Sequence, residues 1–207
     1  MSPEDFVEEL ARHRASAILR CPSDADARVA MDAAIRGGFR ICEFTLTIPH
    51  ACGLIREFAA RSDLVIGAGT VLTREDARAA VAAGARFLVS PVVDREVIEE
   101  AHRLGVASIP GAATPTEMLL AHRLGAPLQK LFPAQPASWI AQVLGPLPFL
   151  RIVPTAGITL ANAREHLAAG AHAVGFVNSL FDPSDVAARR ADAIESRARA
   201  MLEEVGR

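Results

Sequence analysis

Short apolar segments alternate along the whole chain with longer segments in which apolar and charged residues recur at helical spacing. The apolar segments are too short for helices and are typical of parallel strands buried on both faces. We predict eight strands, near residues 15–20, 40–44, 64–67, 86–90, 106–109, 127–132, 150–154 and 172–176. Because a helical segment separates each strand from the next, the pattern indicates repeated β–α units and a parallel sheet.

A glycine stands between a helical segment and the following strand in five of these units. These glycines are Gly38, Gly84, Gly105, Gly125 and Gly170, spaced by about one or two units of roughly 22 residues. Glycine is favoured just past a helix end because the chain there often turns left-handed. The segments 101–105 and 121–125 both read Ala-His-Arg-Leu-Gly, which again indicates a repeated supersecondary unit.

Eight β–α units in 207 residues predict an α/β fold, a single (β/α)8 TIM barrel with minimal loops. An extra helix at 3–13 is expected to cover the barrel floor, and a charged helix at 184–206 to close the ring. Capping boxes at 73–76 and 114–117 mark two helix starts. An open doubly wound sheet is the alternative, disfavoured because no Gly-x-Gly-x-x-Gly follows a strand. No linker interrupts the pattern, so we expect one domain over 1–207.

Composition and charge exclude several classes of function. The net charge of −2 and pI near 6.3 are unlike those of a nucleic-acid-binding protein. No apolar run approaches the roughly 20 residues of a membrane span, and the acidic N-terminus does not resemble a signal peptide. Cys21, Cys42 and Cys52 are odd in number and lack metal-site spacing, which favours reduced thiols. We expect a cytoplasmic protein with no nucleic-acid or membrane partner.

Lys130 is the only lysine in a chain that has 22 lysines and arginines together. A codon preference for arginine explains the loss of lysine elsewhere, but not why this one remains. It stands in the apolar segment 126–133, where an unpaired charge is costly to bury. Arginine cannot replace a lysine that must lose its proton and attack a carbonyl. We therefore predict that Lys130 is a Schiff-base nucleophile; chance survival is the alternative.

Further candidate residues lie at the predicted strand ends, where the active site of such a barrel is found. Arg20 ends the first strand, Glu43 the second, and Thr70 and Pro91 follow the third and fourth. An arginine, a carboxylate and Lys130 are thus expected to meet in one cavity. The alternatives are that Glu43 is a structural partner of Arg20 and that Thr70 caps the next helix.

Several segments occur in the order and spacing of a known family. They are 17–20 (Ala-Ile-Leu-Arg), 43–49 (Glu-Phe-Thr-Leu-Thr-Ile-Pro), 66–71 (Ile-Gly-Ala-Gly-Thr-Val), 89–91 (Val-Ser-Pro), 109–111 (Ile-Pro-Gly), 114–117 (Thr-Pro-Thr-Glu) and 130–133 (Lys-Leu-Phe-Pro). Over roughly residues 15–182 the chain resembles the 2-keto-3-deoxy-6-phosphogluconate and 4-hydroxy-2-oxoglutarate aldolases, class I (β/α)8 enzymes.

The resemblance implies Lys130 as the Schiff-base lysine, Glu43 as the acid/base and Thr70 as a substrate contact. It also implies an arginine for the pyruvate carboxylate. In some members this arginine stands four residues after the glutamate, where this chain has Thr47, and in others at the end of strand one, where it has Arg20. The family is commonly homotrimeric and uses no metal or cofactor.

The chain departs from the family pattern after strands seven and eight, where such barrels usually bind phosphate. Members with phosphorylated substrates tend to have Thr-Gly-Gly and Gly-x-Gly-Ser or Gly-Gly-Ser there, whereas this chain has Thr-Ala-Gly at 155–157 and Gly-Phe-Val-Asn-Ser at 175–179. Ala156 and Val177 place Cβ atoms where bare backbone should approach an anion. A left-handed Ala156 alone would cost on the order of 1–2 kcal/mol. Thr155, Gly157 and Ser179 remain candidate substrate contacts, and Gln135 replaces a glutamate usual in the family.

The sequence therefore predicts a class I aldolase of carbohydrate metabolism with a small-molecule substrate. It would cleave a 2-keto-3-deoxy (phospho)sugar acid or 4-hydroxy-2-oxoglutarate to pyruvate and an aldehyde, glyceraldehyde 3-phosphate or glyoxylate. Phosphorylation of the substrate is left open. A non-catalytic barrel that binds a sugar phosphate or another anion is one alternative. A Schiff-base 2-oxo-acid decarboxylase or dehydratase is another.

Overall fold

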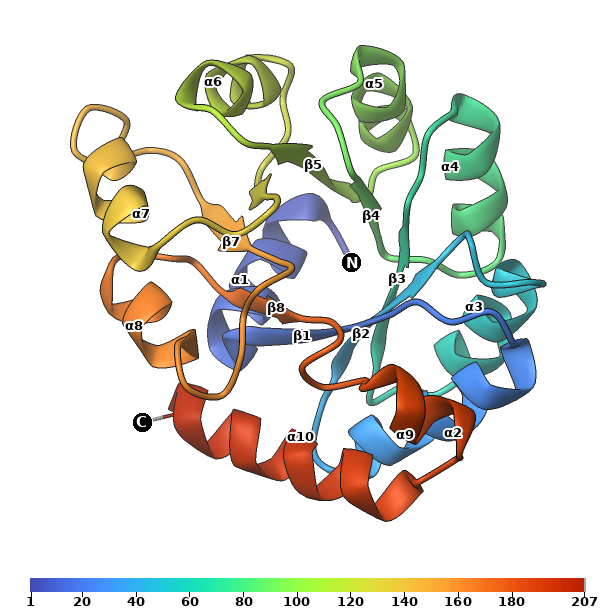
Figure 1. Cartoon of the computed structure of the whole chain (residues 1–207). Helices are drawn as coiled ribbons and strands as arrows, with labels where there is room; N and C mark the ends of the chain where they lie inside the picture. The colour runs from blue at the N-terminus through green and yellow to red at the C-terminus, as the bar shows by residue number, and fades with distance from the viewer. Residues whose placement is uncertain (207) are drawn as a thin grey trace.

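Eight parallel strands follow one another around a barrel, with helices on the outside (Figure 1). The computed structural model describes residues 1–206. The strands are β1 (Ala15–Leu19), β2 (Ile41–Thr45), β3 (Val65–Gly69), β4 (Phe87–Ser90), β5 (Ala107–Ala112), β6 (Gln129–Leu131), β7 (Ile152–Pro154) and β8 (Val174–Phe176). Each overlaps its predicted range, and the predicted (β/α)8 barrel is confirmed.

The barrel closes unevenly. In β2 and β3 every residue is paired, from Ile41 with Val65 to Thr45 with Gly69. Strands β1 and β8 also pair directly. Strands β7 and β8, by contrast, are joined by an isolated bridge between Thr155 and Gly175 and by a hydrogen bond from the backbone N–H of His172 to the Ile152 carbonyl at 2.8 Å. The weakest seam of the barrel therefore lies beside the loops that follow these two strands.

Ten helices are described between residues 1 and 206. They are α1 (Pro3–His13), α2 (Asp24–Arg36), α3 (Ala51–Ala59), α4 (Arg74–Ala82), α5 (Arg95–Arg103), α6 (Pro115–Arg123), α7 (Ala137–Leu144), α8 (Ala163–Ala168), α9 (Pro183–Ala187) and α10 (Ala191–Gly206). The expectation of one continuous helix over 184–206 is wrong. Arg189 has a φ of 52°, a left-handed conformation that no helix interior contains, so the segment divides into α9 and α10.

The predicted helix boundaries are otherwise well supported. The five glycines that precede strands all have a positive φ, between 69° and 117°. Thr73 and Thr114 each accept a hydrogen bond from the backbone N–H three residues on, and the acidic side chain there accepts one in return. Both predicted capping boxes are confirmed.

Helix α1 lies under the barrel at the amino ends of the strands, as predicted. Phe6 is fully buried and its ring stacks on that of Phe87 in β4, with centroids 4.5 Å apart. The Nε2 atom of His172, just before β8, donates a hydrogen bond to the Val7 carbonyl at 3.0 Å. These contacts close the barrel floor, so a substrate can enter only from the opposite end.

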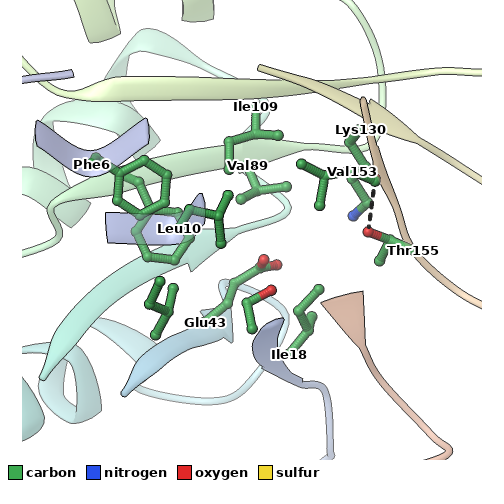
Figure 2. A pocket seen from close by; sticks show the side chains of 12 residues that line it. Phe6, Leu10, Ile18, Glu43, Val89, Ile109, Lys130, Val153 and Thr155 are labelled. Carbon is green, nitrogen blue, oxygen red and sulfur yellow. Dashed lines mark hydrogen bonds between the residues drawn. The ribbon is translucent and has the colours of Figure 1, made fainter. Parts of the chain in front are cut away.

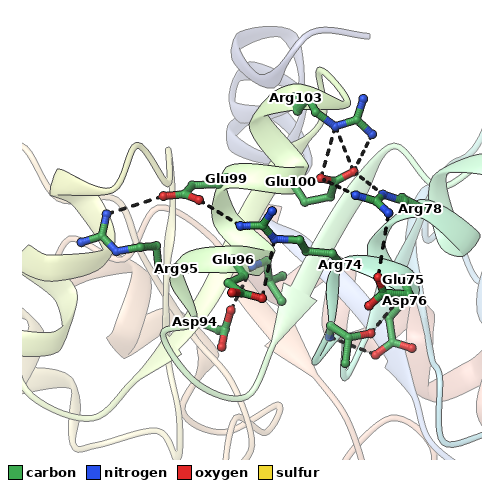
Figure 3. A network of polar contacts seen from close by, with 12 residues as sticks. Arg74, Glu75, Asp76, Arg78, Asp94, Arg95, Glu96, Glu99, Glu100 and Arg103 are labelled. Atoms are coloured by element: carbon green, nitrogen blue, oxygen red, sulfur yellow. Dashed lines mark hydrogen bonds and ion pairs between the residues drawn. The ribbon is translucent and has the colours of Figure 1, made fainter.

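An ion-pair network joins α4 to α5 on the outside of the barrel (Figure 3). Glu100 is buried and accepts hydrogen bonds from Arg103 and Arg78, which lower the pKa of its carboxyl to about 2. Arg74 bridges the same helices by pairing with Glu96 and Glu99. The network holds these two neighbouring helices together. Within residues 1–206, no helix is long and apolar enough to span a bilayer.

Candidate active site

Lys130 is the middle residue of β6, and it pairs with Gly111 of β5 and with Val153 of β7. Its side chain is 8% exposed, and its Nζ lies 4.9 Å from the centre of the Phe132 ring. Burial lowers the pKa of the amine, Glu43 opposes this shift, and Arg20 lowers the pKa further. The direction favours a neutral, nucleophilic amine.

Glu43 faces the same space from β2, on the other side of the barrel (Figure 2). The carboxyl is 2% exposed, and burial raises its pKa, while Lys130 and Arg20 act in the opposite direction. The strand continues beyond it to Thr45, so the expectation that Glu43 ends the strand is wrong. Because strand side chains alternate, Glu43 and Thr45 point inward while Cys42 and Phe44 pack towards the helices.

Gly69 makes the room that the Glu43 side chain occupies. A Cβ atom added at Gly69 would lie 1.9 Å from Oε1 of Glu43, much closer than any real contact. Gly69 is the last residue of β3 and pairs with Thr45 of β2. No sequence pattern that we used predicted this role for Gly69. A glycine inside a strand, marking close approach of another group, was the available signal.

Arg20 follows β1 directly and is exposed at the mouth of the barrel. Its Nη2 donates a hydrogen bond to Oγ1 of Thr70 at 3.2 Å. Thr70 has a φ of 59°, and the cap of α4 is Thr73, so Thr70 does not cap that helix. The Arg20–Thr70 contact turns the guanidinium away from a simple pairing with Glu43 and leaves it available to an anion.

A cavity of about 190 Å³ opens at the carboxyl ends of the strands. Ile18, Arg20, Glu43, Thr45, Lys130, Phe132, Thr155, Ala156, Val177 and Asn178 line it. Below it the barrel interior is packed, with only about 10 Å³ of free space above Phe6 and Leu10 (Figure 2). The cavity is therefore a pocket that is open at the mouth of the barrel and closed at its inner end, and it contains an amine, a carboxyl and a guanidinium group.

Four of the predicted site residues, Arg20, Glu43, Lys130 and Thr155, meet in this cavity. Gly157 and Ser179 line a second cavity beside it. Thr70 reaches the first cavity only through its contact with Arg20. Pro91 lines neither cavity, and its backbone carbonyl lies against Gly111, where an added Cβ would be 2.3 Å away. Its role as a substrate contact stays a prediction.

Three lining residues were missed by the sequence analysis: Ile18, Thr45 and Phe132. Each stands two positions from a predicted site residue, Arg20, Glu43 or Lys130. Since alternate residues of a strand share a face, this spacing was sufficient to find them.

Comparison with known proteins shows the family to which this chain belongs. A family model described as KDPG and KHG aldolase matches residues 7–196. The chain belongs to the KDPG and KHG aldolase family. It is 38% identical over 169 residues to a 2-dehydro-3-deoxy-phosphogluconate aldolase of Treponema pallidum (strain Nichols), covering 79% of this chain and 80% of the relative. A protein of the same name from Pseudomonas aeruginosa is 36% identical over 167 residues, covering 78% and 76%.

A solved structure of this aldolase family also matches. It is described as KDPG aldolase from Legionella pneumophila with pyruvate captured as a covalent carbinolamine intermediate. The TM-score is 0.85 at 27% identity, over 94% of this chain and 97% of that one. The present chain is thus a class I aldolase, a carbon–carbon lyase. The non-catalytic barrel and the decarboxylase or dehydratase are not favoured by any of these relatives.

Proposed function

We propose that this aldolase forms an imine between Lys130 and the ketone of a 2-oxo acid, and cleaves it to pyruvate and an aldehyde. The candidate substrates are 2-keto-3-deoxy sugar acids and 4-hydroxy-2-oxoglutarate. One observation carries the proposal. The only lysine of the chain shares a cavity with a buried glutamate, and an arginine stands at the mouth of this cavity.

Each step uses a group of this cavity. The neutral Nζ of Lys130 adds to the C2 ketone and forms a carbinolamine. Protonated Glu43 gives its proton to the carbinolamine hydroxyl, so that water leaves, an iminium ion forms and Glu43 becomes a carboxylate. Glu43 then takes the proton of the C4 hydroxyl while the electron pair of the C3–C4 bond moves to the iminium. The aldehyde leaves and an enamine of pyruvate remains. Glu43 returns the proton to C3, and water hydrolyses the imine to pyruvate and the free amine.

Arg20 is suited to hold the carboxylate of the 2-oxo acid, because a guanidinium can make two parallel hydrogen bonds to it. Thr70 positions Arg20 through their hydrogen bond. Thr155 stands next to β7 in the same cavity and can contact the substrate near C2. No metal or cofactor is required by any of these steps.

Reductive trapping tests the proposal. Pyruvate and borohydride are added to the protein. The protein is then digested, and the masses of its peptides are measured by mass spectrometry. We expect a pyruvate-sized adduct on the peptide that contains Lys130. The N-terminal amine is the only competitor and lies on another peptide. The Lys130→Arg variant is the matched control and should carry no adduct on that peptide and show no turnover. An active Lys130→Arg enzyme would refute the assignment.

We further propose that residues 1–207 form one catalytic domain and that the protein works as a homotrimer in the cytoplasm, in carbohydrate metabolism. Family membership supports the trimer, and the free thiols of Cys21, Cys42 and Cys52 are compatible with a reducing compartment. Light scattering tests the oligomer. A trimer has three times the 22.0 kDa of the chain, and a mass of 22.0 kDa would refute it.

A further inference from the structure

A second cavity, of about 370 Å³, lies at the seam between β7 and β8. It is lined by residues 156–159 and 177–179. Ala156, Val177 and Asn178 line this cavity and also the cavity of Lys130, so the two are adjacent. A substrate whose ketone lies at Lys130 would place its far end, the future aldehyde, in this second cavity. We call it the distal cavity.

The distal cavity occupies the place where a barrel of this kind usually binds phosphate. Such a site offers backbone N–H groups, the N-terminus of a short helix, and often a cationic side chain. None of the residues that line the distal cavity is a lysine, arginine or histidine. All of its side chains are uncharged. Among the polar ones, Asn178 and Thr159 are exposed.

Several donors around the distal cavity are already bound to the protein itself. The backbone N–H of Thr159 donates to Oδ1 of Asn162 at 2.8 Å. The hydroxyl of Ser179 donates to the Ile158 carbonyl at 2.6 Å. These two donors are therefore not available to an incoming anion, whereas the backbone N–H groups of Ile158, Asn178 and Ser179 have no acceptor among the described residues.

The short helix after β8 begins outside the lining of the distal cavity, and a carboxylate of the protein caps its N-terminus. Asp182, the residue before α9, accepts hydrogen bonds from the backbone N–H of Ser184 at 2.8 Å and of Asp185 at 3.3 Å. The side chain of Asp182 is therefore the anion at this helix end. A phosphate brought there would meet a like charge.

Two side chains also stand where an anion would approach the backbone. Ala156 has a φ of 62°, a conformation that favours glycine, and yet it carries a Cβ atom. Val177 lines both cavities with a branched apolar side chain. Both narrow the approach to the backbone N–H groups without adding a hydrogen-bond donor.

We propose that the aldehyde half of the substrate is uncharged, so that the substrate class is an unphosphorylated 2-keto-3-deoxy sugar acid. Val177 and Ala156 are the specificity-determining residues. The Asn178 side chain, with two donors and an acceptor site, suits the hydroxyl groups of such a tail. A second carboxylate is also disfavoured, since Arg20 is the only guanidinium of the reactive cavity. This inference rests on the proposed function of Lys130.

The test runs the reaction in the direction of synthesis. Purified protein receives pyruvate with glyceraldehyde, glyceraldehyde 3-phosphate or glyoxylate, and the 2-oxo-acid products are quantified. We expect kcat/KM for glyceraldehyde to exceed that for either anionic aldehyde by about tenfold or more, since each missing charge-assisted contact costs a factor of that order. An equal or higher kcat/KM for either anion overturns the inference.

Variants test which residues set the preference. The double variant Val177→Gly with Ala156→Gly should shift the preference towards glyceraldehyde 3-phosphate. Thr159→Arg, which adds a cation at the rim without adding a lysine, should shift it further, whereas the matched Thr159→Gln should not. An unchanged preference in both the double variant and Thr159→Arg overturns the assignment to this cavity.

Trapping of pyruvate on Lys130 tests the proposed function independently of the substrate class, because it needs no aldehyde. An adduct together with a preference for phosphate overturns only the substrate class. No adduct on a folded protein overturns the proposed function, and the inference about the aldehyde falls with it.

Discussion

At the scale of single residues, the site depends on two groups whose ionisation is shifted by burial. Lys130 and Glu43 are buried in one cavity, so the pKa of the amine is lowered and that of the carboxyl is raised. Both shifts favour the neutral forms, which suit a nucleophile and an acid/base near neutral pH. Shifts in opposite directions within one pocket are typical of catalytic pairs.

Glu43→Gln should separate imine formation from proton transfer. We expect turnover to fall by about 10²- to 10⁴-fold, the usual contribution of a general acid/base. Trapping of pyruvate on Lys130 should persist at a lower rate, because water can supply the proton for dehydration, while exchange of the pyruvate methyl protons for deuterium should be lost. A variant that still exchanges these protons at the wild-type rate would exclude Glu43 as the proton carrier.

Arg20→Gln should alter the pH dependence of imine formation. Arg20 lowers the pKa of Lys130, so its loss should raise that pKa towards its ordinary value. The acid limb of the trapping rate should then move to higher pH, because less of the amine is neutral at a given pH. Pyruvate binding should also weaken by about 1.5–3 kcal/mol, the value of a hydrogen bond to a charged group.

The control for this experiment is Arg95→Gln, which removes an exposed arginine of α5 that pairs with Glu99 on the outer surface. Its pH profile should equal that of the wild type. If Arg20→Gln leaves the acid limb unmoved, or moves it to lower pH, Arg20 does not act on Lys130 as described.

Gly69→Ala should damage the enzyme by moving Glu43. The added Cβ would overlap the carboxylate, and a displacement of about 1 Å can cost on the order of 100-fold in turnover. The matched control is Gly53→Ala in α3, where nothing lies within 4 Å of the added Cβ. It should keep full turnover and gain up to about 1 kcal/mol of stability, since alanine favours helix. Equal turnover in both variants would contradict the role of Gly69.

At the scale of elements, α1 is a structural floor and supplies no reacting group. Its Ser2 cap with Asp5 fixes where the helix begins, and its apolar face enters the barrel through Phe6, Val7 and Leu10. The helix thereby fills space that would otherwise admit water beneath Lys130 and Glu43. Dry surroundings are what shift the pKa values of these two groups.

Phe6→Ala should therefore destabilise the whole barrel. We expect the free energy of unfolding to fall by about 3–5 kcal/mol, the usual cost of removing a buried phenylalanine. Denaturant titration measures it. Phe149→Ala is the control, because this ring is 46% exposed and should change stability by only about 0.5 kcal/mol. Similar losses in both variants would show that α1 does not anchor the floor.

At the scale of the whole molecule, the barrel has few backbone pairs between β7 and β8, where we propose that the substrate extends. The bridge between Thr155 and Gly175 joins β7 to β8, and the two loops that line the distal cavity leave from these strands. Strands β2 and β3, which hold Glu43 and Gly69, are paired throughout. Glu43 is thus on the fully paired side of the barrel, and the loops for which we propose a specificity role are on the less paired side.

Hydrogen exchange should reveal this asymmetry. We expect the backbone amides of 155–158 and 175–179 to exchange faster than those of 41–45 and 65–69, because regions with few backbone pairs open more easily. Exchange measured by mass spectrometry on short peptides checks this. Equal protection of the two regions would mean that the seam is held by more than the observed bridge.

Much of the fold was predictable because its signals are local. Short apolar segments, helical patterns, glycines after helices and capping boxes depend on neighbouring residues, and together they placed all eight strands. The break at Arg189 was not predictable, because the charged segment around it has good helical character throughout and only packing divides α9 from α10.

The sequence by itself determined the barrel, the family, and the three residues Arg20, Glu43 and Lys130, because each stands in a local pattern at or near the end of a strand. Only the tertiary structure decided what surrounds them. That Gly69 makes room for Glu43, that Ser179 and Thr159 use their donors internally, and that Asp182 occupies the end of α9 are relations between side chains and neighbouring backbone. Such relations arise from strand register and loop path, which are set when the barrel closes and depend on no local pattern.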